Sequence, residues 1–92
     1  MDNPTMKLTV SLALCIAPTA ALAAANCPKY PKAEWMPQGE ARAKIESMGY
    51  KISKFKIDGH CYEIYGVDKE GRKAEVYFDV KTLNVVKAEI RK

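Results

Sequence analysis

The sequence predicts an α+β fold in which one helix packs on a four-stranded antiparallel β-meander. Apolar residues recur at helical spacing in residues 38–48, and from residue 50 onward the alternation is typical of strands. Three turn signals, at Asp58-Gly59, 68–71 and 79–84, divide this second part into four strands. A helix and a sheet of this size bury their apolar residues by forming two layers.

The first quarter of the chain has the composition of a signal peptide. Lys7 gives a basic start, residues 8–17 form a short apolar run, and an alanine-rich stretch offers cleavage sites. We expect residues 1–25 to be removed, with cleavage after Ala23 or Ala25. A membrane span is the weaker interpretation, because a span needs roughly 20 strongly apolar residues. We therefore expect a periplasmic or secreted protein with no stable membrane anchor after cleavage.

Composition and cysteine count limit the classes of function. The formal net charge of the 92 residues is +4, and glutamates lie between the lysines, which indicates a solvated surface and no nucleic-acid partner. Cys27 and Cys61 follow the leader, and in an exported chain they are expected to form a disulfide that stabilises the fold by roughly 3 to 4 kcal/mol. A metal site or other cofactor is not expected, because the chain has no CxxC and one histidine, His60.

The residues after the leader predict a covering segment and then the helix. Three prolines within 26–37 favour an extended segment that covers part of the domain, and residues 38–92 form the domain itself. We expect the helix at Gln38 to Met48, with Gly49 just past its end. Its apolar stripe consists of Ala41, Ile45 and Met48.

Turn chemistry predicts the register of the strands. An Asp58-Gly59 turn places Ile57 opposite His60, Phe55 opposite Tyr62 and Lys54 opposite Glu63. A three-residue loop closed by Gly71 sets Asp68 against Arg72 and Ile64 against Val76.

Both hairpins then agree on the two faces of the sheet. The face covered by the helix carries Phe55, Ile57, Tyr62, Ile64, Val76 and Phe78, continued by Val86, Ala88 and Ile90. The opposite face carries Lys54, Cys61, Glu63, Tyr65, Glu75 and Tyr77. Because Cys61 lies on that opposite face, a disulfide to Cys27 would draw the proline-rich segment across it. In the last turn, Asn84 suits a left-handed conformation better than Leu83.

The order of these motifs resembles the PepSY family of small exported domains. The chain reads WMPQGEARAKIESMGY, then a lysine-rich strand, then GHCYEIYGVDKEGRKAEVYFD and finally TLNVV, so the resemblance spans Trp35 to about Ile90. It departs from the family in the last turn, 79–84, which lacks the usual proline and glycine. The resemblance implies an inhibitory or binding module, as in propeptides of secreted metalloproteases, and it brings no catalytic residues.

The residues themselves also argue against an enzyme. His60 lies beside a turn, and the hydroxyls of Ser47, Ser53 and Thr82 are spread over different elements, so no catalytic triad is expected. Glu63 and Glu75 lie on neighbouring strands, and an ion-pair ladder with lysines is the simpler interpretation of that pair.

The remaining functional candidate is a binding surface. Trp35, Tyr65 and Tyr77 are aromatic residues of the kind that anchor interfaces, and Glu63 lies beside them. We expect a protein or peptide partner in the cell envelope, with inhibition or regulation of an envelope or secreted protease as the finer hypothesis. The alternative is a protein that stabilises the envelope and has no discrete ligand, in which the segment after Cys27 covers these rings.

Overall fold

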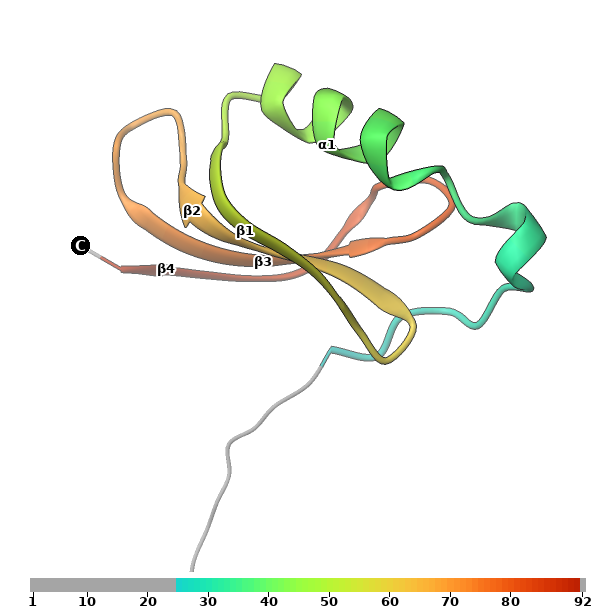
Figure 1. Ribbon diagram of the computed structural model, residues 1–92. Coiled ribbons are helices and arrows are strands. Elements are labelled where there is room, and N and C mark those ends of the chain that lie inside the picture. Colours follow the sequence, from blue (N-terminus) through green and yellow to red (C-terminus); the bar gives the residue numbers. More distant parts are fainter. Residues whose placement is uncertain (1–24, 92) are drawn as a thin grey trace, which may run out of the picture.

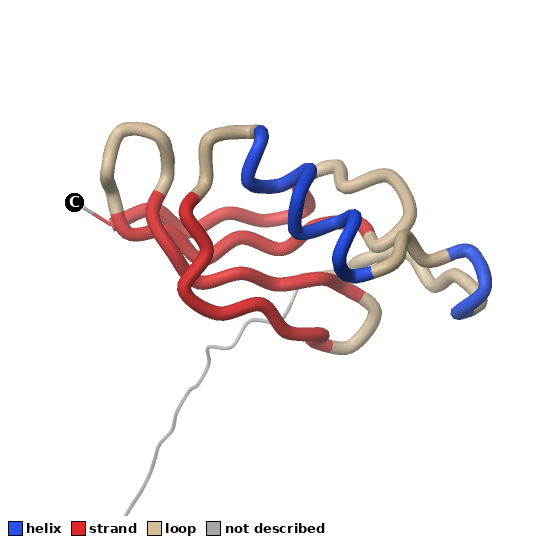
Figure 2. Tube along the Cα trace, turned by 45° about the horizontal axis from the view of Figure 1, so that its top comes forward, coloured by secondary structure: helices blue, strands red, loops and turns tan. Residues whose placement is uncertain are grey.

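The chain has the predicted architecture of one helix on a four-stranded antiparallel sheet. The computed structural model describes residues 25–91. A short 3-10 turn comes first, at η2 (Lys32–Glu34). It is followed by α1 (Gln38–Ser47), β1 (Lys51–Asp58), β2 (Cys61–Val67), β3 (Lys73–Asp79) and β4 (Val85–Arg91). The strand order β1-β2-β3-β4 is a meander, and α1 lies across one face of it (Figures 1 and 2). Of the expected signal peptide, residues 1–24 lie outside the described residues, and so does the expected cleavage after Ala23. Within 25–91, no helix is long and apolar enough to cross a bilayer.

Helix α1 begins at the expected residue, Gln38, and ends one residue earlier than expected, at Ser47. Pro37 is its N-cap, and Gly49, with φ of 106°, follows the C-cap residue Met48. Ala41 and Ile45 are fully buried, whereas Met48 is 43% exposed. The prediction that Met48 continues the buried stripe was wrong, because the helix ends at Ser47 and its cap residue no longer packs into the core.

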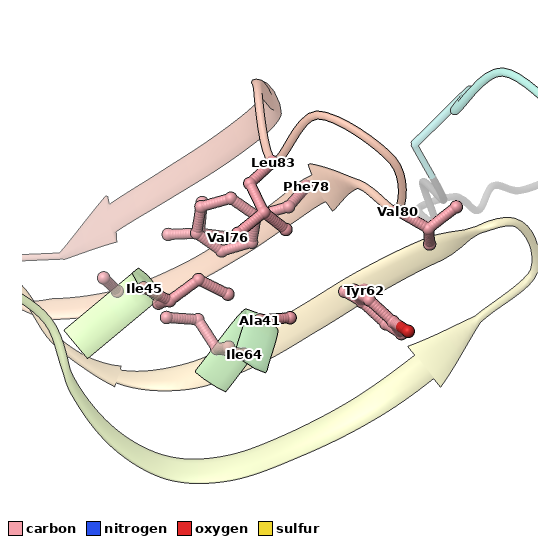
Figure 3. Packing of buried hydrophobic residues seen from close by; sticks show 9 residues of the cluster. Ala41, Ile45, Tyr62, Ile64, Val76, Phe78, Val80 and Leu83 are labelled. Carbon is pink, nitrogen blue, oxygen red and sulfur yellow. The ribbon is translucent and has the colours of Figure 1, made fainter. Parts of the chain in front are cut away.

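The core lies between α1 and the adjoining face of the sheet (Figure 3). The buried cluster consists of Ala41, Ile45, Tyr62, Ile64, Ala74, Val76, Phe78, Val80 and Leu83. Strand β4 supplies none of these residues. Its residues Ala88 and Ile90 pair with Val76 and Ala74 on the expected face, but they remain exposed. The helix therefore covers only part of the apolar face, and the apolar row of β4 lies outside the core.

The register of the first hairpin differs from the prediction by two residues. Gly59 and His60 form the turn, so Asp58 pairs with Cys61 and Ile57 with Tyr62. Gly59 has a φ of 61°, and it is the first central residue of the turn, the position that a type II′ hairpin gives to glycine. A shift of two residues keeps every side chain on its predicted face. Phe55 accordingly pairs with Ile64, on the same face as the predicted partner Tyr62.

The second hairpin has the predicted register, and the last turn does not have the predicted conformation. Ile64 pairs with Val76 and Tyr62 with Phe78, as expected. In the last turn, Leu83 and not Asn84 has positive φ, at 63°. The left-handed conformation costs roughly 1 to 2 kcal/mol for such a residue. Burial of the Leu83 side chain in the core offsets that cost.

Candidate functional site

The face of the sheet that points away from α1, which we call the outer face, brings together three of the four predicted binding residues. Glu63 pairs with Tyr77, and Tyr65 pairs with Glu75, in neighbouring positions of β2 and β3. Because side chains alternate along a strand, these four share the outer face. This face therefore holds a compact cluster of two carboxyl groups and two phenols.

The fourth predicted residue, Trp35, lies elsewhere. Its ring packs edge-on against the ring of Tyr62, with centroids 5.6 Å apart, and Tyr62 points into the core. The indole Nε1 donates a hydrogen bond to the backbone oxygen of Tyr30 at 2.9 Å. Trp35 thus holds the N-terminal segment on the helix side of the sheet, and the structure does not bring it to the outer face.

Glu63 is the most buried member of the cluster. Its residue is 1% exposed, and the nearest cation, Lys56 Nζ, lies 3.9 Å from Oε1. Lys56 occupies the cross-strand position that the sequence had assigned to Lys54. Burial, followed by the neighbouring Glu75, raises the pKa of the Glu63 carboxyl.

The pKa of the Glu75 carboxyl shifts in the opposite direction. The hydrogen bond with Glu63 holds the pKa of the Glu75 carboxyl below its ordinary value. The Oε2 atom of Glu63 is buried, and no hydrogen bond to it is found among the described residues. Two carboxyl groups this close share a proton more easily than they both ionise. Glu63 is therefore the carboxyl group of the pair that takes up a proton first as the pH falls.

The two tyrosines differ in exposure. Tyr77 is 7% exposed, and its hydroxyl donates to Glu75 Oε2 at 3.0 Å. Tyr65 is 37% exposed, and its interaction with Glu63 raises its pKa to about 12. The ammonium groups of Lys54 and Lys56 lie 5.6 and 5.8 Å from the centre of the Tyr65 ring. Tyr65 is therefore the aromatic residue of the cluster that a partner can reach.

A hollow of about 270 Å³ adjoins Tyr65 on this face. Its lining includes the apolar Val67, the cations Lys73 and Arg91, and the carboxylates Glu75 and Glu89. Pockets for small molecules run from roughly 300 to 1,000 Å³. A hollow of this size with charges of both signs suits a side chain of a bound peptide.

The backbone of two strands shapes the same area. Between Ile52 and Lys54 the register of β1 shifts, which leaves Ser53 at a bulge on the rim of the hollow. Opposite this bulge, a β-carbon on Gly66 would lie 1.9 Å from the backbone oxygen of Lys51. Only glycine fits there, so Gly66 permits the close approach of the two strands beside Tyr65.

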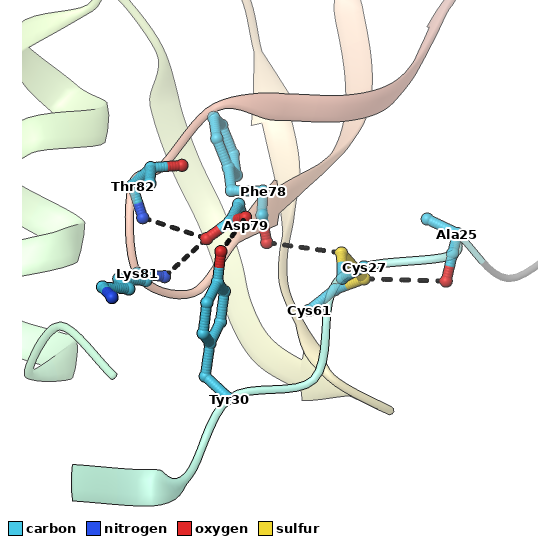
Figure 4. The surroundings of a disulfide bond; sticks show 8 residues. All are labelled: Ala25, Cys27, Tyr30, Cys61, Phe78, Asp79, Lys81 and Thr82. Atoms are coloured by element: carbon cyan, nitrogen blue, oxygen red, sulfur yellow. Dashed lines mark hydrogen bonds between the residues drawn. A yellow bond between two sulfur atoms is a disulfide. The ribbon is translucent and has the colours of Figure 1, made fainter. Parts of the chain in front are cut away.

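The predicted disulfide between Cys27 and Cys61 is present, with the Cα atoms 5.4 Å apart (Figure 4). It fastens the N-terminal segment where β2 begins and β3 ends. Tyr30 Oη donates to Asp79 Oδ2 at 3.3 Å, and the backbone nitrogen of Met36 donates to the oxygen of Val80 at 2.8 Å.

The segment therefore passes around the end of the sheet toward α1 (Figure 1). We had expected it to cross the outer face. The hydrogen bonds and ring contacts of its described residues lie at the sheet end and in the core, and Tyr65 is 37% exposed. The segment thus leaves the area around Tyr65 uncovered.

The polar groups outside this cluster serve local structure. Ser47 Oγ donates to the backbone oxygen of Lys44, and Thr82 Oγ1 accepts from the backbone nitrogen of Asn84. His60 is exposed in the β1–β2 turn. In the part of the chain that the structure describes, no three His, Cys, Asp or Glu side chains are grouped to hold a metal ion.

These features define a small disulfide-linked α+β domain whose distinctive surface is the outer face of its sheet. The family model PepSY_2, described as peptidase propeptide and YPEB domain, matches residues 7–89, which is nearly the whole sequence. The chain belongs to this PepSY family. Neither a curated protein nor a solved structure matches it.

Proposed function

We propose that this chain is an exported, non-enzymatic PepSY domain that binds a protein or peptide partner through the outer face around Tyr65. The observation that carries the proposal is the uncovered Tyr65 ring beside a hollow of about 270 Å³. Tyrosine is favoured at interfaces because it offers a large contact area with few rotatable bonds. The neighbouring charges of both signs suit a peptide better than a uniformly charged ligand.

The rigidity of this surface favours binding. Its residues lie on three hydrogen-bonded strands, so a partner pays little conformational entropy to order them. Tyr77 Oη donates to Glu75 Oε2 at 3.0 Å, and the neighbouring Glu63 raises the pKa of Tyr65, so each tyrosine lies beside a carboxyl group.

The finer proposal is that the partner is an envelope or secreted protease, which the domain inhibits or regulates. Its support is the description of the family, which names peptidase propeptides. The disulfide is typical of proteins that fold in an oxidising compartment, where such proteases also act. In such a complex, Tyr65 would occupy a peptide-binding surface of the protease. Inhibition of this kind requires no catalytic group in the PepSY domain.

Partner capture tests the binding proposal. The oxidised protein is cross-linked in native envelope extract, and the captured proteins are identified against a scrambled-sequence control. A reproducible partner is the expected result, and recovery of nothing above the control contradicts binding. Hydrolysis of casein by secreted proteases, with and without added protein, then tests the inhibition proposal separately. Hydrolytic turnover by the pure protein itself, lost in His60→Ala, would overturn the non-enzymatic assignment.

A structural role without a discrete ligand is the second candidate. It is favoured by the burial of Glu63 and Tyr77, since two of the three predicted binding residues on the outer face are buried. The two candidates separate on Tyr65→Ala. A structural protein loses thermal stability in this variant and has no partner to lose, whereas a binding domain loses capture at an unchanged melting temperature.

A further inference from the structure

The two edge strands of the sheet carry different charge patterns. β1 and β4 are the edges, so each presents unpaired backbone groups on its outer side. β1 carries Lys51, Lys54 and Lys56 and a bulge at Ser53. A row of positive charges and a bulge both oppose pairing of this edge with a second copy.

The β4 edge lacks that uniform charge. Its charged residues on the outer face are Lys87, Glu89 and Arg91, which alternate in sign at every second position. The pairing with β3 is regular from Lys87 to Arg91, because the irregularity of this strand lies before Lys87. β4 is therefore the edge that can accept another strand.

We propose that β4 pairs antiparallel with β4 of a second copy of this chain, about a two-fold axis at Ala88. This register places Lys87 of each copy opposite Glu89 of the other, twice by symmetry. The two sheets then form one eight-stranded sheet across the dimer. Glu89 and Arg91 of this strand also line the hollow beside Tyr65, but the pairing argued here rests on β4 itself and does not depend on the proposed function.

The pleat and the charges together select this register. Directly opposed residues in an antiparallel pair must lie on the same face, so the axis falls on a residue and not between two residues. An axis at Lys87 or Glu89 sets that residue against its own copy, which is a like-charge pair. An axis at Ala88 sets Lys87 against Glu89, and it lies at the middle of β4, whose register with β3 is regular from Lys87 to Arg91.

The apolar face of β4 is complementary in the same register. Ala88 lies on the axis, where a small side chain fits, and Ile90 of each copy comes near Val86 of the other, which stands at the irregularity of β4. Val86 and Ile90 are 38% and 39% exposed, and no buried residue of the core comes from β4. Pairing places these side chains against one another without any movement of α1.

The charges of β4 are already arranged for such a network. Lys87 Nζ lies 3.3 Å from Glu89 Oε2 of the same strand, and both side chains are partly exposed. In the dimer, the two lysines and two glutamates form a ring of alternating charges across the axis. Exposed ion pairs are individually weak, so we expect a dimer whose population depends on protein concentration and on salt.

Charge exchange tests the proposal. The purified, disulfide-bonded protein is studied by sedimentation equilibrium over a concentration series, as wild type, Lys87→Glu, Glu89→Lys and the double variant. Each single variant puts like charges at both contacts and should associate at least about tenfold more weakly. The double variant restores unlike pairs and should dimerise like wild type. Glu46→Lys, an exposed charge reversal on α1, is the matched control.

Mixing the two single variants separates the interface from effects on folding. One variant then carries two glutamates and the other two lysines, so their mixture should form a heterodimer although neither associates alone. In the wild type, the backbone amides of β4 that point away from β3 should exchange hydrogen more slowly as concentration rises. A monomeric wild type at every concentration overturns the proposal, and so does association that the single variants leave unchanged.

Discussion

Glu63 and Glu75 interact directly across neighbouring strands of the outer face, and the pKa values of their carboxyl groups shift in opposite directions. Burial is the main cause of the upward shift at Glu63, and the hydrogen bond from Glu63 is the main cause of the downward shift at Glu75. Within this pair, Glu63 is the carboxyl group that takes up a proton first as the pH falls. The pair lies beside the tyrosines of the proposed binding surface, and Lys56 remains 3.9 Å away.

We predict that Glu63→Gln raises the melting temperature at neutral pH by a few degrees. The folded-state pKa of Glu63 is raised, so its favourable contribution is present at acidic pH and is lost as pH rises through that pKa. Glutamine keeps a donor toward Glu75 and cannot ionise. Thermal unfolding from acidic to neutral pH measures this, with Glu46→Gln as a control for loss of one exposed charge. Equal destabilisation of Glu63→Gln at all pH values would contradict the raised pKa of Glu63.

We predict that replacing both cysteines, Cys27→Ser with Cys61→Ser, lowers the free energy of unfolding by roughly 3 to 4 kcal/mol. The bond spans 34 positions and ties the N-terminal segment to β2, so its loss frees a long loop in the unfolded chain. Urea unfolding with and without reductant checks this. Reductant should destabilise the wild type and leave the double variant unchanged, and a wild type insensitive to reduction would refute the prediction.

We predict that Gly66→Ala destabilises the domain by about 2 kcal/mol or more, because the new β-carbon would lie 1.9 Å from the backbone oxygen of Lys51. The β1–β2 pairing beside the hollow would have to open. Gly39→Ala is the matched control: nothing lies within 4 Å of its added β-carbon, and alanine is the better helix residue by up to about 1 kcal/mol. Equal stability changes in the two variants, measured by urea unfolding, would disprove the close approach.

We predict that Asp68→Asn removes part of the acid dependence of stability. The backbone N–H of Arg72 donates to Asp68 Oδ1 at 2.9 Å, and its Nε donates to Oδ2 at 2.8 Å. These bonds, the backbone bond first, lower the pKa of Asp68, so its contribution is present above the ordinary pKa and is lost as pH falls through the folded-state value. Melting curves of the two proteins should differ near neutral pH and converge in acid. A difference that grows in acid would contradict the assignment.

The sheet faces were predictable from sequence because a register error of an even number of residues leaves each side chain on the same face. The β1–β2 register was wrong by two residues, since Asp58-Gly59 and Gly59-His60 are both plausible two-residue turns. This two-residue error in register leaves Phe55 and Ile57 on the same face as Tyr62 and Ile64. The pairing of Glu63 changed from Lys54 to Lys56 for the same reason.

What could not be predicted depends on tertiary packing. Leu83 adopts the left-handed conformation because its side chain is buried, which no local preference indicates. The path of the N-terminal segment depends on the hydrogen bond from Met36 to Val80 and the contact of Trp35 with Tyr62. Because the sequence does not show this path, the prediction placed Trp35 in the candidate site, which was wrong.

The affinity of the captured partner for Tyr65→Ala tests the central claim most directly. Tyr65 is exposed on the outer face, and Ile57→Ala, which alters an exposed apolar residue on the opposite face, is the matched control. We predict that Tyr65→Ala binds the partner at least about tenfold more weakly, the loss typical of an interface anchor, with an unchanged melting temperature. Ile57→Ala should bind like the wild type. Wild-type affinity in Tyr65→Ala would contradict the claim that this domain binds its partner through the outer face.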